Sequence, residues 1–146
     1  DYDSLPVGSV IDYDGEEIPV GYKEVTDPNT YSTEEQMAGY FIENGVKRPY
    51  YKKTLILTSF APSDTIVNTK EHGISNLDDI LKIYGTFKRA DGVRETVNRL
   101  DNTTSWLCYI GDMSDTTVSI LVGSNYKNNQ AITRMILNVE YTKTTD

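Results

Sequence analysis

The sequence predicts an all-β protein, an antiparallel β-sandwich head preceded by a short irregular, collar-like neck segment. Turn-forming residues recur at short, regular intervals, and the runs between them are rich in β-branched and aromatic residues. Two runs, residues 79–88 and 131–143, alternate apolar and polar residues with the period of two that a half-buried strand requires. Turns at this spacing are typical of a sandwich or a barrel.

Residues 1–46 are expected to form the neck or connector. Prolines and glycines punctuate the first 30 residues, so only short extended pieces fit, such as Ser9–Tyr13 and Tyr22–Val25. A segment this small buries too little apolar surface to offset its ordering entropy, so we expect it to pack on the main domain or on identical chains.

Two interpretations remain open for residues 31–46. Ser32 precedes Glu35 at capping-box spacing, which favours a short helix. Alternatively, Tyr40–Glu43 is a strand that pairs with Lys47 onward across the turn dipeptide Asn44-Gly45.

Residues 47–146 are expected to form the head domain. Its strands are separated by turns such as Pro62–Asp64, Ala90–Gly92 and Asp101–Thr103. The predicted strands cover residues 50–60, 65–69, 79–88, 93–100, 105–112, 116–123 and 131–143.

The strand at residues 79–88 is the clearest inward-facing strand, and the last strand is its best partner. In the first, one face carries Leu81, Ile83, Gly85 and Phe87. In the second, one face carries Ala131, Thr133, Met135, Leu137, Val139 and Tyr141. Ile132 and Ile136 lie on the otherwise polar face of the last strand. Apolar residues there indicate that a neighbouring module or subunit covers that face.

Composition and charge exclude several classes of protein. At 146 residues the chain has room for one domain and an appendage, and its eleven tyrosines favour an aromatic binding surface. The net charge of −8 argues against nucleic-acid binding, which needs a basic face. The one basic cluster, at residues 47–53, is interpreted as a solvated strand entry.

The single cysteine and the single histidine limit the disulfide and metal chemistry that the chain can support. Cys108 cannot form an intrachain disulfide, and with only His72 beside it the chain has no Cys/His metal framework. We interpret Cys108 as a small buried strand residue and His72 as a cap on backbone groups at a strand entry. No run is long enough to span a membrane and no signal peptide is visible, so we expect a soluble chain. Because it begins at Asp1, we expect a fragment of a longer protein.

Four segments in combination resemble a known family. Leu5–Tyr22 (LPVGSVIDYDGEEIPVGY) resembles a collar-like segment of bacteriophage tail proteins. Arg48–Thr54 (RPYYKKT), His72–Ile80 (HGISNLDDI) and Glu140–Asp146 (EYTKTTD) resemble the C-terminal domain of tail-fibre or receptor-binding proteins from phages and prophages of Gram-positive bacteria. The family usually reads valine-alanine-histidine-glycine before the isoleucine, where this chain has Thr69-Lys-Glu-His72.

The resemblance implies a head domain at the tip of a tail fibre or baseplate spike in the virion. It implies a homotrimer that contacts other tail or baseplate proteins and acts outside the host cell. Its task would be adhesion to a host cell-wall or capsular polysaccharide, without insertion into a membrane. Such heads keep their scaffold and vary their loops, so the matching motifs are expected to be scaffold.

The sequence offers no catalytic machinery, and we expect a protein that is not an enzyme and needs no cofactor. Glycosidases hold two carboxylates at a set separation, but Asp78 and Asp79 are neighbours in one strand and point to opposite faces. Asp112 and Asp115 bracket a turn and are too few for a calcium site. No nucleophile elbow, phosphate loop or dinucleotide-binding glycine motif is present.

Aromatic, amide and carboxylate side chains remain as candidates for binding a sugar. The receptor-facing tips are predicted at loops 101–105, 112–115 and 124–130, with Tyr84 as a further outward aromatic. The candidate ligand-binding residues are Trp106, Tyr109, Asp112, Asp115, Asn125, Tyr126 and Asn128. As the only tryptophan, Trp106 fits the core better than a sugar platform. Two other functions stay open, a connector that only assembles and a glycan depolymerase.

Overall fold

The computed structural model describes residues 9–11, 17–19, 32–101 and 105–145, and the chain divides into two compact units, Asp1–Tyr31 and Ser32–Asp146. In the smaller unit, β1 (Ser9–Ile11) pairs antiparallel with β2 (Glu17–Pro19). The extended piece predicted from Ser9 is therefore present, whereas β2 is not among the predicted strands. The piece predicted at Tyr22–Val25 lies outside the described residues.

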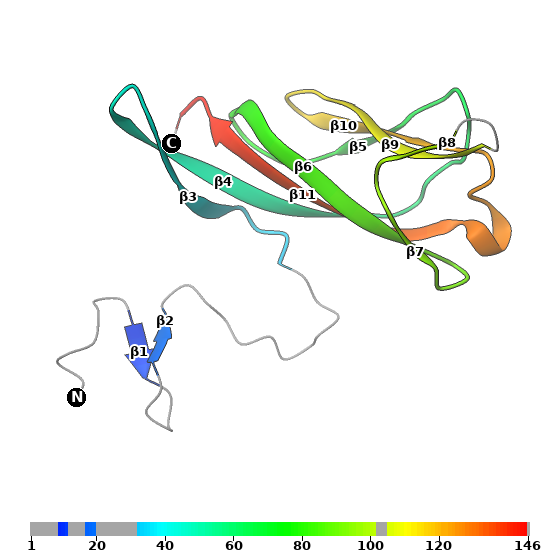
Figure 1. The fold of residues 1–146 in the computed structure, drawn as a ribbon, viewed down its shortest axis with the longest axis horizontal. Coiled ribbons are helices and arrows are strands. Elements are labelled where there is room, and N and C mark those ends of the chain that lie inside the picture. Colours follow the sequence, from blue (N-terminus) through cyan, green and yellow to red (C-terminus); the bar gives the residue numbers. More distant parts are fainter. Residues whose placement is uncertain (1–8, 12–16, 20–31, 102–104, 146) are drawn as a thin grey trace. The chain divides into compact units, whose positions relative to one another are not determined.

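The larger unit consists of two antiparallel sheets (Figure 1). The five-stranded sheet has the order β3 (Gln36–Glu43), β4 (Val46–Leu57), β11 (Ile132–Lys143), β6 (Leu77–Arg89) and β7 (Arg94–Thr96). The four-stranded sheet has the order β5 (Asn68–Glu71), β10 (Thr117–Val122), β9 (Trp106–Met113) and β8 (Arg99–Asp101). A short 3-10 turn covers Asn128–Gln130. The all-β, antiparallel class predicted from the sequence is confirmed.

Both sheets contribute side chains to one hydrophobic core. The most deeply buried hydrophobic residues come from the inner faces of β6, β9, β10 and β11 and from the loops beside them. They include Phe87, Cys108, Val118, Ile120, Val122, Tyr126, Met135, Leu137, Val139 and Tyr141. How the two sheets are stacked, and with it the sandwich, stays a prediction. Within the described residues, no helix has the length and apolar character needed to cross a membrane.

The segment after residue 32 is a strand and not a helix. Asn44 and Gly45 both have positive φ angles, 51° and 77°, which is the geometry of a tight two-residue hairpin turn. Around this turn β3 pairs with β4, from Glu43 opposite Val46 to Gln36 opposite Lys52. Because β3 belongs to the five-stranded sheet, the unit boundary lies at residue 31 and not at residue 46.

Strand β6 follows the predicted alternation except at its start. Phe87 is buried and Ile83 is half-buried, as predicted, but Leu81 is 50% exposed. The pairing with β11 slips there, because Lys82 lies opposite Glu140 while Ile80 lies opposite Tyr141. Leu81 is thus the extra residue of a β-bulge, and a bulge interrupts the alternation of faces.

A second bulge explains where the prediction for β11 is wrong. Met135 through Tyr141 alternate inward as predicted, but Thr133 is exposed and Ile132 is buried in its place. Ile132 pairs with Arg89 and Arg134 pairs with Lys88, which leaves Thr133 without a partner position. Its hydroxyl donates a hydrogen bond to the Lys88 carbonyl oxygen at 2.9 Å.

The predicted strand at residues 93–100 is two strands in different sheets. β7 pairs with β6 and β8 pairs with β9, and the chain crosses between the sheets at Val97. Val97 is buried, and its amide donates to the Gly85 carbonyl at 3.0 Å. The strand predicted at residues 65–69 begins three residues later, at Asn68.

Candidate functional site

Most of the residues predicted to bind a sugar lie toward two opposite ends of the four-stranded sheet, and Tyr109 lies between them in the middle of β9. Trp106 begins β9, near the loop at residues 123–131, whereas Asp112 is near the end of β9, at the hairpin leading into β10. The eight residues of β9 separate its two ends by about 23 Å. The predicted residues therefore do not form one site.

Tyr126 is buried, so its prediction as an exposed sugar contact is wrong. Only 1% of the residue is exposed, and its ring packs edge-on against Phe87 and Trp106, with centroids 5.4 and 4.9 Å away. Its hydroxyl donates a hydrogen bond to Glu95 Oε2 at 3.1 Å. Burial, followed by the charge of Glu95, raises the pKa of Tyr126. Tyr126 therefore belongs to the core.

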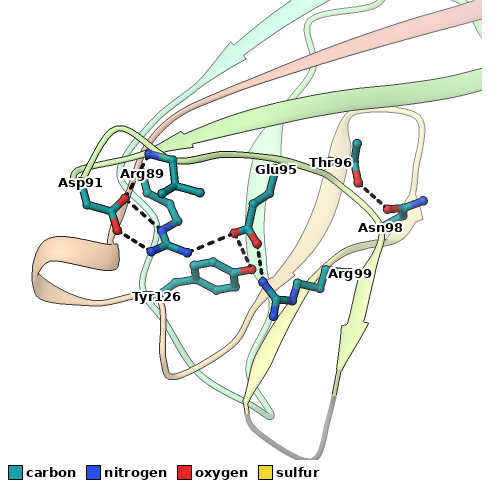
Figure 2. Close-up of polar contacts among 8 residues, drawn as sticks. Arg89, Asp91, Glu95, Thr96, Asn98, Arg99 and Tyr126 are labelled. Carbon is teal, nitrogen blue, oxygen red and sulfur yellow. Dashed lines mark hydrogen bonds and ion pairs between the residues drawn. The ribbon is translucent and has the colours of Figure 1, made fainter.

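Glu95 is the centre of a charge network around Tyr126 (Figure 2). Its carboxylate contacts Arg99 Nη1 in a short ion pair and Arg89 Nη1 at 3.7 Å. Arg89 also pairs with Asp91. The two acids balance the two arginines, so the network braces β7 and β8 and leaves no net charge for a ligand.

Trp106 lies beside this network and is half-buried. The guanidinium carbons of Arg89 and Arg99 lie over its ring, 5.3 and 5.4 Å from the centroid. Together with Tyr126, these cations occupy the surroundings that a sugar ring would need for stacking. Tyr109 extends from the other face of β9, because it lies three residues along the strand, and it is opposite Leu121.

Asp64 ties together two of the loops predicted to face a receptor. Its carboxylate accepts hydrogen bonds from Ser105 Oγ at 2.8 Å and from the Ser124 amide at 2.9 Å. These hydrogen bonds lower the pKa of Asp64, and the bond from the Ser124 backbone amide has the largest effect. The sequence identified Asp64 only as a turn residue. Its hydrogen-bond partners lie 41 and 60 positions away, so no local pattern reveals them. Residues 102–104 of the first loop lie outside the described residues.

The two predicted asparagines of the longer loop differ in exposure. The backbone N–H of Asn125 donates to the Ser105 carbonyl oxygen at 3.3 Å, and Asn125 is half-buried. Asn128 is exposed and has a positive φ of 54° at the start of the 3-10 turn. Asn128 is thus the more accessible of these two predicted contacts.

Asp112 and Asp115 are exposed at the β9–β10 hairpin, where Ser114 makes the turn. Ser114 Oγ accepts hydrogen bonds from the amides of Thr116 and Thr117, at 3.3 and 3.0 Å. Across the described part of the chain, no group of three or more His, Cys, Asp or Glu side chains is placed to hold a metal ion. Turn formation therefore accounts for this acidic loop.

The capping role predicted for His72 is confirmed. The ring is 2% exposed, Nδ1 accepts a hydrogen bond from the Ile74 amide at 3.0 Å, and Nε2 lies 2.9 Å from the Ser114 carbonyl oxygen. A neutral imidazole with its proton on Nε2 satisfies both contacts. Cys108 is buried as predicted, and burial raises its pKa to about 12, so the thiol is not a nucleophile at neutral pH.

A shallow hollow lies beside the part of β4 that β3 does not cover. The pairing of β3 ends opposite Lys52, and the hollow has a volume of about 400 Å³. It is lined by Thr33, Glu34, Glu71 and the β4 residues from Lys53 to Leu57. The two acids and the one lysine come from different elements of the chain.

The outer face of the five-stranded sheet, which points away from the core, carries the exposed aromatic that fits a binding surface best. Tyr84 is 38% exposed, with Lys82 Nζ 4.7 Å and Lys52 Nζ 5.8 Å from its ring centroid. In the same cross-strand row lie Asn138 and Thr54, joined by a 2.8 Å hydrogen bond. An aromatic ring, a hydroxyl, an amide and two ammonium groups thus converge on one face.

Comparisons of the chain with protein-family models, with curated proteins and with solved structures found no match.

Proposed function

We propose that this chain is a non-enzymatic, carbohydrate-binding head of a phage tail fibre or baseplate, which attaches the virion to a host cell-surface polysaccharide. The observation that carries the proposal is the Tyr84 row on the outer sheet face, where a partly exposed ring lies beside the Asn138–Thr54 pair. The resemblance to phage receptor-binding heads supports the same function.

The chemistry of the row suits a sugar. A tyrosine ring offers a flat apolar surface with little conformational entropy to lose, and it can stack on the apolar side of a sugar ring. Asn138 and Thr54 provide an amide and a hydroxyl, which both donate to and accept from sugar hydroxyls. Because these groups stand on paired strands, their spacing is fixed before a ligand arrives.

The proposal moves the binding surface from the loops to the sheet. Tyr126 is in the core, and Arg89 and Arg99 lie over Trp106, so the loop end keeps mainly Asn125 and Asn128 as polar contacts. We therefore treat the loop end as the rival location for the same function.

A pull-down of host-type cell walls and a glycan array, both with the full chain, test the proposal. Tyr84→Ala should lower binding at least about tenfold, because stacking on one aromatic is a major contact in a small site. Val67→Ala is the control, since Val67 is also exposed, at 45%, and lies outside the five-stranded sheet. Loss of binding in an Asn125→Ala/Asn128→Ala variant but not in Tyr84→Ala would place the site on the loop. No binding by wild type to any glycan would refute the function.

A homotrimer is part of the proposal, and an exposed apolar strip supports it. The strip, called the hairpin strip below, consists of Met37, Tyr40 and Ile42 on one face of β3, with exposures of 54, 51 and 68%. Exposed apolar side chains at this density are typical of contact surfaces between chains.

The hairpin strip also favours the second candidate function, a tail or baseplate connector that assembles without binding a glycan. A connector would keep its oligomeric state in the Tyr84→Ala variant and show no affinity for host walls in either form. A depolymerase stays untested. Release of reducing sugar by wild type, but not by Asp112→Asn or Asp115→Asn, would favour it.

A further inference from the structure

One edge of β4 is open next to the hollow described above. β3 pairs with β4 from Val46 to Lys52, and β4 continues without it to Leu57. On its other side β4 stays paired with β11 as far as Leu57. Among the described residues, no second strand and no loop backbone group bonds to residues 53–57 on the open side. The beginning of β3 thus leaves an open edge of β4 at the border of the five-stranded sheet.

The backbone of Leu55 is directed to β11 and not to the open edge. The Gly85 carbonyl oxygen accepts the Val97 amide at 3.0 Å, so the backbone groups of Gly85 point away from β11. In such a pair without mutual hydrogen bonds, the opposite residue also points away, and here that residue is Leu137. Leu137 is therefore directed to β4, where it lies opposite Leu55. These two residues bond each other.

Thr54 and Ile56 consequently present their N–H and C=O groups to the open edge, because successive residues of a strand face opposite sides. The hairpin turn gives the same result independently. Glu43 and Val46 flank a two-residue turn and bond each other, and counting in twos from Val46 along β4 reaches Thr54 and Ile56. Two donors and two acceptors are thus aligned along the open edge, which is the arrangement that an added strand recognises.

The hollow gives an added strand room for one side chain. Residues directly opposite each other in a sheet share a face, and Leu55 points into the core. The residue of an added strand opposite Leu55 therefore points into the hollow, whose volume of about 400 Å³ accommodates a long side chain. The residues on either side of it point to the outer face, beside the half-buried Thr54 and Ile56.

The lining of the hollow has a net negative charge. Glu34 and Glu71 line it, and neither carboxylate makes a hydrogen bond or an ion pair with another described residue. Lys53 also lines the hollow, but its ammonium group donates to a backbone carbonyl oxygen at 2.8 Å. Lys70, next to Glu71 on β5, donates in the same way to a loop carbonyl oxygen at 2.8 Å. Two carboxylates against one lysine in the lining favour a cation as the side chain that enters.

We propose that the open edge of β4 binds an extended peptide segment of another protein as an added strand, with a lysine or arginine of that segment in the hollow. The added strand continues the line of β3, which already occupies the same edge of β4 up to Lys52. A second copy of this edge fits less well, because it would bring the carboxylates of two Glu34 and two Glu71 side chains together. The inference goes beyond the proposed function, since it uses backbone groups at the sheet edge and not the aromatic ring on the outer face.

Hydrogen exchange of single amides in the full-length chain tests the edge without any ligand. The Thr54 and Ile56 amides should exchange at least about a hundredfold faster than the Leu55 amide, which bonds to β11. Equal protection of the three amides would mean that the edge is already paired, and it would overturn the inference.

Three synthetic peptides of about seven residues test the occupant. The first alternates valine and threonine around a central lysine, and the second has glutamate in place of that lysine. The third keeps the lysine but carries N-methyl groups on the two residues beside it, which are the ones that would bond to β4. We expect the first to bind with a Kd below about 1 mM, the second at least about tenfold more weakly, and the third not measurably. Binding of the first should slow exchange of the Thr54 and Ile56 amides.

Three variants of the full chain locate the contact. Glu34→Gln/Glu71→Gln should weaken binding of the lysine peptide at least about tenfold. Asp78→Asn/Asp115→Asn removes the same charge from exposed positions outside the hollow and should leave binding within about twofold. Ile56→Pro removes one donor of the open edge and should abolish binding. Thermal unfolding should show that this variant still folds, because proline is tolerated where the N–H points away from the sheet.

Each failure has a separate meaning. No binding of the lysine peptide, or equal binding of the N-methylated one, would overturn strand addition. Equal affinity for the lysine and glutamate peptides, or equal loss in the control variant, would overturn the basic residue in the hollow. Self-association of the chain that Ile56→Pro abolishes would assign the edge to a second copy and overturn the choice of partner. None of these results bears on glycan binding, which is measured separately on host cell walls.

Discussion

At the scale of single residues, Glu95 has the most partners to lose. Its side chain is 17% exposed and contacts Arg89, Arg99 and the Tyr126 hydroxyl. Glu95→Gln keeps the shape but leaves two poorly solvated guanidinium groups with less negative charge, so we expect the free energy of unfolding to fall by about 2 kcal/mol. Urea denaturation with an unchanged m-value measures this.

The matched control for that change is Glu43→Gln. Glu43 pairs with Arg48, but the two side chains are 53 and 40% exposed, so the loss should be below about 0.5 kcal/mol. Equal losses in the two variants would show that the Glu95 network contributes no more than a surface ion pair.

The hydrogen bonds of Asp64 predict how the stability of the fold depends on pH. Its pKa is lowered in the folded chain by the Ser124 amide and by the Ser105 and Ser124 hydroxyls. A carboxyl whose folded pKa lies below its unfolded pKa stabilises the fold above the unfolded pKa, near 3.8, and this contribution is lost as pH falls through the folded pKa. Asp64→Asn should therefore unfold more easily than wild type at neutral pH, and the difference should shrink as the pH falls below the unfolded pKa. A stability difference that stays constant with pH would contradict this role of the carboxylate.

At the scale of elements, β6 and β11 approach each other closely at Gly85. A Cβ placed on Gly85 would lie 2.1 Å from the Ile136 carbonyl oxygen and 2.7 Å from Leu137 Cδ2. Gly85→Ala must push these strands apart, and we expect a loss of about 3 kcal/mol in denaturation experiments. In Gly111→Ala the nearest atom would be 3.6 Å away, so the matched variant on β9 should lose less than about 1 kcal/mol. Similar losses in the two variants would mean that β6 and β11 separate around the added methyl group without an energetic cost.

Local sequence predicts some features of the strands but not others. Period-two alternation predicted the inward faces of β6 and β11, and the Asn44-Gly45 turn favoured the β3–β4 hairpin, because both signals lie within a few residues. The bulges at Leu81 and Thr133 depend on the register with a partner strand, which the local pattern does not contain. For the same reason the crossing at Val97 between two sheets was predicted as one continuous strand.

At the scale of the whole molecule, strand order determines which predicted site residues come together. Loops 112–115 and 124–130 are near in sequence, but the first precedes β10 and the second follows it. They therefore lie at opposite ends of that strand. Lys52, Lys82 and Lys88 are distant in sequence, but β4, β11 and β6 are neighbours, so these lysines share one face. Tyr84 was visible beforehand as an outward aromatic, whereas its row with Asn138 and Thr54 depends on a pairing that only the folded chain defines.

The predicted homotrimer is the last consequence at this scale. If the hairpin strip is the contact between chains, the full-length protein should have a mass near three times 16.5 kDa by light scattering. Ile42→Glu places a charge in that contact and should shift the mass to one chain, because burying an unpaired carboxylate is costly. Ile66→Glu is the matched control, since Ile66 is as exposed, at 70% against 68%, but lies outside the strip, and it should stay trimeric. A wild-type monomer, or a trimer that both variants keep, would exclude the hairpin strip as the trimer contact, while glycan binding by the outer sheet face would remain testable on the same samples.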